Sequence, residues 1–94
     1  MSSPKIKLEY FQYFLKDRKK YLKNNPQRLE EYKKAITLFL SNPAHPGLNL
    51  ERLTNTKGVY TIRINKSDRI FFIWKEANTA IFIDIGKHDK YRKY

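Results

Sequence analysis

The sequence of 94 residues contains no cysteine, only three glycines and no long apolar run. The absence of cysteine excludes disulfide bonds and thiolate metal sites. So few glycines, with no GxxxxGK segment, give no support for the phosphate-binding loop of an NTPase. No segment reaches the roughly 18 consecutive apolar residues of a transmembrane helix. The two histidines, His45 and His88, are far apart and form no HxxxH pair, so we expect neither a metal site nor a cofactor.

The chain is also too short for a second core, and we expect one domain over residues 1–94. Hydrophobic residues make up 40% of it, and they include six Phe and seven Tyr. This content is sufficient for a packed interior and argues against disorder. The first residues, MSSPKIKLEY, lack the apolar stretch of a secretory signal, so we expect a cytoplasmic protein.

Acidic residues are scarce: the chain has nine Asp and Glu and 20 Lys and Arg. Its formal net charge is therefore +11. Such a charge repels itself in the folded state, and a polyanionic partner offsets that repulsion. Contacts to nucleic-acid phosphates gain further from the release of counterions. The charge therefore predicts a nucleic acid or an acidic protein as partner. A membrane surface is not favoured, since the basic stretches also carry aromatic side chains that face the core.

The first half of the chain has the pattern of one strand and two helices. Residues 5–10 alternate between polar and apolar side chains, which predicts a short strand. Helical spacing begins near Gln12, and Asn25-Pro26 predicts the cap and first position of a second helix that ends at residues 41–43. So short a turn predicts an antiparallel helical hairpin. The apolar positions expected to be buried are Phe14, Leu15, Tyr21, Leu22, Leu29, Tyr32, Ile36, Phe39 and Leu40.

The second half has the pattern of an antiparallel meander. Residues 44–58 read as a loop with a short strand near 50–53, and three alternating segments follow at 59–65, 69–76 and 79–86. Two tight turns join the three segments. The whole order predicts an α+β domain, in which a helical hairpin covers one face of a sheet that contains a meander of three to four strands.

The alternation also predicts which side chains of the meander face the helices. The set expected on the helix side is Ile62, Ile64, Ile70, Phe72, Ile81, Ile83 and Ile85. The set expected on the other side is Thr61, Arg63, Arg69, Phe71, Phe82 and Asp84. Two arginines on adjacent strands are not needed to cover a core. They indicate either an ordinary solvated face, with Arg69 paired to Asp84, or a site for an anion.

The last segment, DIGKHDKYRKY, adds chemically capable side chains where the final strand leaves the sheet. His88 and Tyr91 could lean over the face that carries the arginines. A histidine exchanges protons near neutral pH, a tyrosine ring stacks on a base, and guanidinium groups bind phosphate. These groups are sufficient for metal-free attack of a ribose 2′-hydroxyl on its phosphate. Phosphate binding without catalysis uses most of the same residues, so both readings stay open.

Several stretches, taken in this order, resemble the RelE/ParE superfamily of small toxins from bacterial toxin–antitoxin pairs. They are NPQRLEEYKKAI, GLNLERL, GVYTIRI followed by DRIFFIW, and FIDIGKHDKY, and the resemblance extends from residue 5 to residue 92. It implies a RelE-like fold and, in the ribonuclease branch, an endoribonuclease that cuts mRNA in the ribosome and leaves a 2′,3′-cyclic phosphate. It also implies a cognate antitoxin, the ribosome and mRNA as partners.

The resemblance assigns roles residue by residue. Arg63 matches a cation on the first meander strand, and Arg69 matches an arginine that usually binds phosphate. His88 matches the arginine or histidine that follows the last strand. Tyr91 lies near a terminal aromatic residue of the family, with Tyr94 as a rival, and Glu51 matches a general base of some members. Thr61 departs from the pattern, because some relatives have lysine there and one phosphate contact is then missing. The lysines expected to bind substrate are Lys16, Lys19, Lys20, Lys23, Lys87 and Lys90.

Two other functions are compatible with the same sequence. The superfamily also contains inhibitors of DNA gyrase, which generally lack the set formed by Arg63, Arg69, His88 and Tyr91. A basic RNA-binding module without catalysis would share the charge and most of the site. The ribonuclease is the function that this set of four residues favours.

Overall fold

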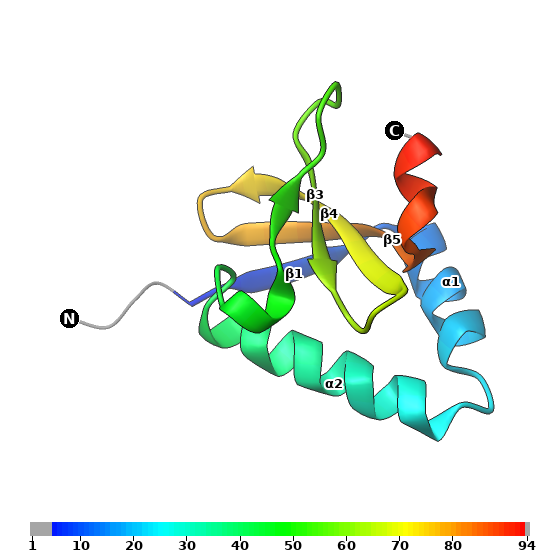
Figure 1. The fold of residues 1–94 in the computed structure, drawn as a ribbon. Coiled ribbons are helices and arrows are strands. Elements are labelled where there is room, and N and C mark those ends of the chain that lie inside the picture. The colour runs from blue at the N-terminus through cyan, green and yellow to red at the C-terminus, as the bar shows by residue number, and fades with distance from the viewer. Residues whose placement is uncertain (1–4, 94) are drawn as a thin grey trace.

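The chain follows the predicted order of one strand, two helices and a meander (Figure 1). The computed structural model describes the backbone of residues 5–93 and the side chains of residues 5–90. The helices are α1 (Gln12–Leu22), α2 (Pro26–Ser41) and two 3-10 helices, η1 (Pro46–Leu48) and η2 (His88–Lys93). The strands are β1 (Lys7–Tyr10), β2 (Glu51–Arg52), β3 (Val59–Arg63), β4 (Asp68–Glu76) and β5 (Thr79–Lys87). The predicted α+β fold is therefore confirmed.

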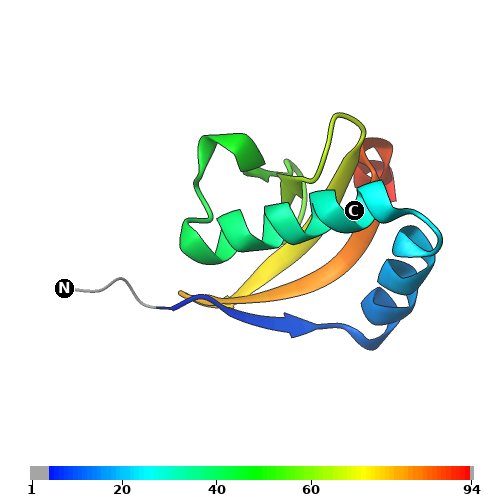
Figure 2. The same cartoon turned by 90° about the horizontal axis from the view of Figure 1, so that it is seen from below.

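The five strands form one sheet in the order β1-β5-β4-β3-β2. The strands from β2 to β5 are antiparallel, whereas β1 runs parallel to β5 at the edge of the sheet. This pairing joins the first strand to the last, which alternation within either strand could not predict. The two helices lie on one side of the sheet, and α2 crosses it (Figure 2).

The junction between the helices has the predicted cap. The Asn25 side chain accepts a hydrogen bond of 3.1 Å from the Arg28 backbone N–H, and Pro26 occupies the first helical position. An asparagine in this place satisfies one of the free N–H groups at the helix start. The helices diverge from this turn (Figure 2), and the largest contact of α1 is with β5.

The main core lies between the helices and the sheet. Phe14 of α1 and Phe39 of α2 are fully buried against Phe72 and Phe82, with ring centroids 5.2 to 5.7 Å apart in edge-to-face geometry. Burying an aromatic side chain of this size contributes about 1.5–3 kcal/mol. These four rings hold both helices to the strands that carry the candidate site.

A β-bulge in β5 changes which side chains face that core. Phe71 pairs with Asp84 while Phe72 pairs with Phe82, so Ile83 is an extra residue in the ladder. The extra residue reverses the alternation on one side of the bulge. Phe82 therefore packs under the helices, whereas Ile81 and Ile83 lie on the opposite face with Val59 and Phe71. The predictions for Phe82, Ile81 and Ile83 were wrong for this reason.

The buried stripe of each helix is narrower than the pattern predicted. In α2 the buried side chains are Tyr32, Ala35 and Phe39, whereas Leu29 and Leu40 are exposed. At 3.6 residues per turn these two leucines lie about 100° to one side of the buried line. Leu15 is displaced from Phe14 in the same way and is also exposed. No helix within residues 5–93 combines the length and apolar character needed to span a bilayer.

Candidate active site

Both predicted arginines and the predicted histidine lie at one end of the sheet. In the register of the strands, Arg63 of β3 stands opposite Arg69 of β4, and Arg69 stands opposite Gly86 of β5. Lys87 completes β5 and His88 begins η2. Arg63, Arg69 and Gly86 are thus placed in one row across three strands, and His88 follows two residues after that row.

The two arginines differ in their surroundings. Arg63 is exposed, whereas Arg69 is only 7% exposed and donates from Nη1 to the backbone carbonyls of Asn65 and Asp68, at 3.1 Å each. Burial, followed by repulsion from Arg63, lowers the pKa of the Arg69 guanidinium from its ordinary value. Both side-chain hydrogen bonds that Arg69 makes within residues 5–90 start at Nη1, so Nε and Nη2 remain available to a ligand.

Neither arginine forms a salt bridge with a carboxylate among the described side chains. Like charges directly opposite on adjacent strands are destabilising. An anion placed between the guanidinium groups would offset this repulsion through charge-assisted hydrogen bonds. The pair therefore has the electrostatic character of a phosphate site.

Glu51 lies on the strand next to the one that carries Arg63. It belongs to β2 and pairs with Thr61, which is two residues from Arg63 in β3. Its carboxylate is exposed, accepts 3.0 Å from the Asn49 side-chain amide, and acts to raise the pKa of Arg69. The predicted base is thus close enough to the arginines to influence them. Thr61 is buried and supplies no cation there.

His88 begins η2. Both η2 and the 53–58 segment lie on the side of the sheet away from α2 (Figure 1). The His88 side chain is exposed, and its backbone N–H donates to the Ser67 carbonyl at 2.8 Å. That bond ties the start of η2 to the turn between β3 and β4. Tyr91 follows within η2, but its side chain and the whole of Tyr94 lie outside the described part of the chain, so the role of either stays a prediction.

Lys90 has a different environment from the one predicted. Its Nζ donates to Asp84 Oδ1 at 2.9 Å and to the Ile85 carbonyl at 3.0 Å, and the Asp84 side chain is fully buried. Lys90 thus neutralises a buried carboxylate instead of standing free for a substrate, and Asp84 is paired with it, not with Arg69. Gly86 makes the approach possible, because it has φ +147 and a Cβ there would lie 2.9 Å from Lys90 Cε.

The other predicted lysines are on the surface. Lys16, Lys19, Lys20 and Lys23 are exposed along and just after α1, and Lys87 is exposed at the end of β5. Both views place α1 and η2 at the same end of the molecule (Figures 1 and 2). The cationic surface formed by these lysines therefore lies at the end of the molecule that also holds η2.

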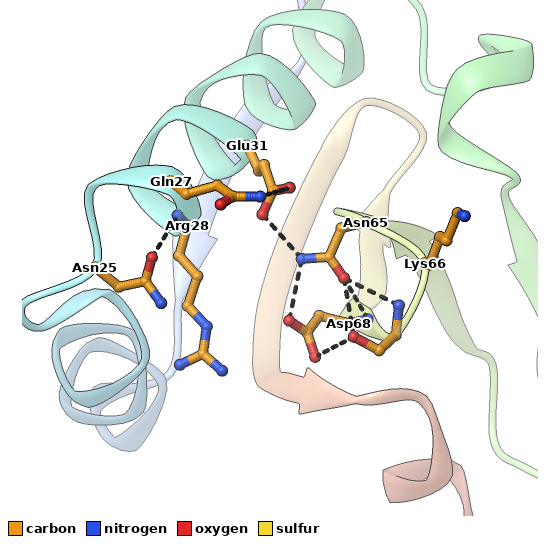
Figure 3. A pocket seen from close by; sticks show the side chains of 8 residues that line it. Asn25, Gln27, Arg28, Glu31, Asn65, Lys66 and Asp68 are labelled. Atoms are coloured by element: carbon orange, nitrogen blue, oxygen red, sulfur yellow. Dashed lines mark hydrogen bonds between the residues drawn. The ribbon is translucent and has the colours of Figure 1, made fainter.

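A polar cluster below the row was missed by the sequence analysis. The Tyr21 hydroxyl donates to Asp68 Oδ2 at 2.6 Å. The Asn65 amide donates to Asp68 at 3.1 Å and to Glu31 at 3.0 Å (Figure 3). Burial, and next the bond to Asp68, raise the pKa of the Tyr21 hydroxyl, which keeps it a donor. The pattern Asn65-Lys-Ser-Asp68 is typical of a turn held by an asparagine side chain. It is the sequence feature that could have predicted this turn.

The second histidine has a local role. His45 Nδ1 accepts 3.0 Å from the Gly47 backbone N–H and so caps η1. It also lines a small pocket with Lys34 of α2 and with Arg63. Within the described residues, no group of three or more His, Asp and Glu side chains is arranged to hold a metal ion.

Comparison with solved structures identifies the fold. No family model matches the sequence, and no curated protein matches it in sequence. A YoeB/ParE toxin from Agrobacterium tumefaciens is similar with a TM-score of 0.72 and 16% identity, over 88% of this chain and 99% of that one. The chain has the fold of the YoeB and YafQ toxins.

Two complexes contain the same toxin fold. The E. coli DinJ–YafQ toxin–antitoxin complex is similar with a TM-score of 0.73 and 18% identity, over 92% of this chain and 96% of that one. The YoeB–YefM complex from Staphylococcus aureus has a TM-score of 0.68 and 21% identity, over 90% and 99% of the two chains. The toxin fold implied by the sequence resemblance is confirmed, and at these identities the likeness concerns the fold.

Proposed function

We propose that the chain is the toxin of a toxin–antitoxin pair and cleaves mRNA on the ribosome without a metal ion. The observation that carries the proposal is the cross-strand pair Arg63–Arg69, which forms no salt bridge among the described side chains and lies in register with Gly86, two residues before His88. A scissile phosphate between the two guanidinium groups would remove their mutual repulsion and would be held by charge-assisted hydrogen bonds.

The proposed reaction is an in-line attack of a ribose 2′-oxygen on the adjacent phosphorus. The O2′–P bond forms as the P–O5′ bond breaks, so the products are a 2′,3′-cyclic phosphate and a 5′-hydroxyl. One proton leaves O2′ and another is delivered to O5′. His88 exchanges a proton with one of these oxygens, and Glu51 is the candidate for the other transfer. The arginines stabilise the charge that develops on the phosphate oxygens.

Binding of the ribosome and mRNA is assigned to the cationic surface beside the site. The exposed lysines of the α1 region and Lys87 supply it, whereas Lys90 is engaged with Asp84. Tyr91 is proposed to stack on or orient the nucleotide. The DinJ–YafQ and YoeB–YefM complexes support a cognate antitoxin as the protein partner of this chain.

The deciding experiment incubates the protein with programmed ribosomes and, separately, with naked mRNA, and maps cut ends by primer extension. We expect cuts with 5′-hydroxyl ends that depend on the ribosome. Intact mRNA with cleaved or relaxed DNA would identify a gyrase inhibitor instead. Tight binding of RNA without cutting would identify a basic RNA-binding module.

A further inference from the structure

The turn between β3 and β4 contacts both of the residues proposed to act on the phosphate. The carbonyls of Asn65 and Asp68 each accept a hydrogen bond from Arg69 Nη1, at 3.1 Å. The carbonyl of Ser67 accepts 2.8 Å from the His88 backbone N–H. Three carbonyls of residues 65–68 thus accept hydrogen bonds, two from the Arg69 guanidinium in β4 and one from the first residue of η2.

The Asn65 side chain fixes the shape of this turn. Its Oδ1 accepts from the backbone N–H groups of Ser67 at 3.0 Å and Asp68 at 2.9 Å. This arrangement, in which an asparagine side chain bonds its own backbone two and three residues on, holds a turn in one conformation. The Asp68 N–H and the Ser67 carbonyl share one peptide plane, so the bond to the Asp68 N–H also sets the direction of the carbonyl that accepts from His88.

Side chains of both helices also bond to the turn, and Figure 3 shows the bond from α2. From α1, the Tyr21 hydroxyl donates to the Asp68 carboxylate at 2.6 Å, and the Asp68 side chain is buried at 5% exposure. From α2, Glu31 accepts from the Asn65 amide at 3.0 Å. Arg28 braces Tyr21, because its guanidinium lies 4.4 Å from the ring centroid and donates 3.1 Å to the Tyr21 carbonyl.

We propose that Tyr21, Glu31, Asn65 and Asp68 form a clamp that positions Arg69 and His88 for catalysis. The inference rests on the proposed function for its catalytic part, whereas the geometric part concerns the free protein alone. None of the four touches the phosphate in this proposal, so they are positioning residues. Catalytic groups displaced by about 1 Å lose on the order of a hundredfold in rate, which is the scale on which such a clamp acts.

The key variant is Tyr21→Phe, which keeps the ring under Arg28 and removes only the hydroxyl that holds Asp68. The matched control is Tyr32→Phe, since the Tyr32 hydroxyl is also buried and bonded within the helices, to Arg18 at 3.3 Å, but does not contact the turn. A second test variant, Asn65→Asp, keeps the oxygen that shapes the turn and removes the amide that reaches Glu31 and Asp68.

Two measurements are needed on each variant. Amide hydrogen exchange of His88, with the NMR signals of the Arg69 guanidinium, reports positions in the free protein. Single-turnover cleavage at saturating ribosomes reports the chemical step, and the ribosome affinity is measured alongside it. In Tyr21→Phe and Asn65→Asp we expect faster His88 exchange, shifted Arg69 signals and cleavage about 10- to 100-fold slower, with affinity within about twofold of the parent. Tyr32→Phe should match the parent in all of these.

Other outcomes separate the two hypotheses. Unmoved His88 and Arg69 signals in Tyr21→Phe, with parental cleavage, would overturn the clamp. Equal losses in Tyr21→Phe and Tyr32→Phe would overturn it too, because they would reflect general destabilisation. If the parent protein cuts no RNA while the signals move only in the clamp variants, the positioning stands and the ribonuclease proposal fails.

Discussion

Arg63 and Arg69 stand directly opposite one another on β3 and β4, and no described carboxylate forms a salt bridge with either. An arrangement of this kind costs free energy in the empty protein, because like charges face each other across the strands. The stability and the binding function of the site are therefore expected to oppose one another.

The first prediction follows from that opposition and concerns Arg63→Gln. Removing the exposed charge should leave the free energy of unfolding unchanged or raise it by about 0.2–1 kcal/mol, since a repulsive cross-strand pair disappears. The same change should weaken RNA binding and slow cleavage, because a phosphate contact is lost. Urea denaturation and cleavage assays on one preparation test both. A variant that loses stability along with activity would show that Arg63 has a structural role.

The second prediction concerns His88. Loss of one proton-transfer group typically lowers the rate by about 10² to 10⁴-fold. We expect His88→Gln to slow single-turnover cleavage by that order on saturating ribosomes, with nearly unchanged binding and thermal stability, because the side chain is exposed. Asp89→Asn is the neighbouring control and should cleave like the parent. Cleavage by His88→Gln at the parental rate would reduce the tail to a basic binding segment.

The third prediction concerns the lysines of the α1 region. Reversing Lys16, Lys19, Lys20 and Lys23 to Glu should weaken ribosome binding and reduce its dependence on salt, since fewer counterions are released. The fold should persist, because all four side chains are exposed. Affinity measured over a series of salt concentrations, together with circular dichroism, tests this. An unaltered salt dependence would place the ribosome contact elsewhere.

The fourth prediction concerns the pair Lys90–Asp84. Lys90→Met removes the ammonium group that lies 2.9 Å from the fully buried Asp84 carboxylate and should lower the free energy of unfolding by roughly 2–3 kcal/mol, less than for two buried charges because Lys90 is partly exposed. Adding Asp84→Asn should recover part of that loss, since the buried charge that Lys90 neutralised is then gone. Denaturation of the single and double variants measures both effects. Equal stability of the two variants would mean that the charge of Asp84 does not need Lys90.

The fifth prediction concerns alkaline pH. The pKa of Tyr21 is raised in the folded state by burial and by Asp68, so the folded protein holds this proton more tightly than the unfolded chain. The resulting stability is fully present below about pH 10, the ordinary tyrosine range, and is lost as the pH rises towards the folded value. The stability difference between the parent and Tyr21→Phe should therefore shrink above pH 10. A difference that stays constant across this range would contradict the strong Tyr21–Asp68 bond.

Local signals in the sequence were sufficient to predict the helices and strands and the segments that carry the candidate site residues. The cap at Asn25, the helical spacing after Gln12 and the tight turns of the meander act over a few residues, so their physics is already present in the chain. The alternation also predicted Arg63 and Arg69 on one face of adjacent strands, with His88 where the final strand leaves the sheet. The structure pairs the two arginines and places His88 directly after β5.

Tertiary structure alone decided the features that depend on contacts between distant segments. A single extra residue at Ile83 reverses the facing of Phe82, and no alternation rule within β5 indicates where a bulge falls. The basic tail of the sequence predicted that Lys90 binds substrate, but the fold buries Asp84 next to Lys90 and so determines its partner. Tyr21 reads as an apolar position of a helix, and only the approach of the β3–β4 turn gives its hydroxyl an acceptor. For Asp84 and for Tyr21 the deciding contribution is the cost of burying a polar group without a partner, which depends on what the fold places beside it.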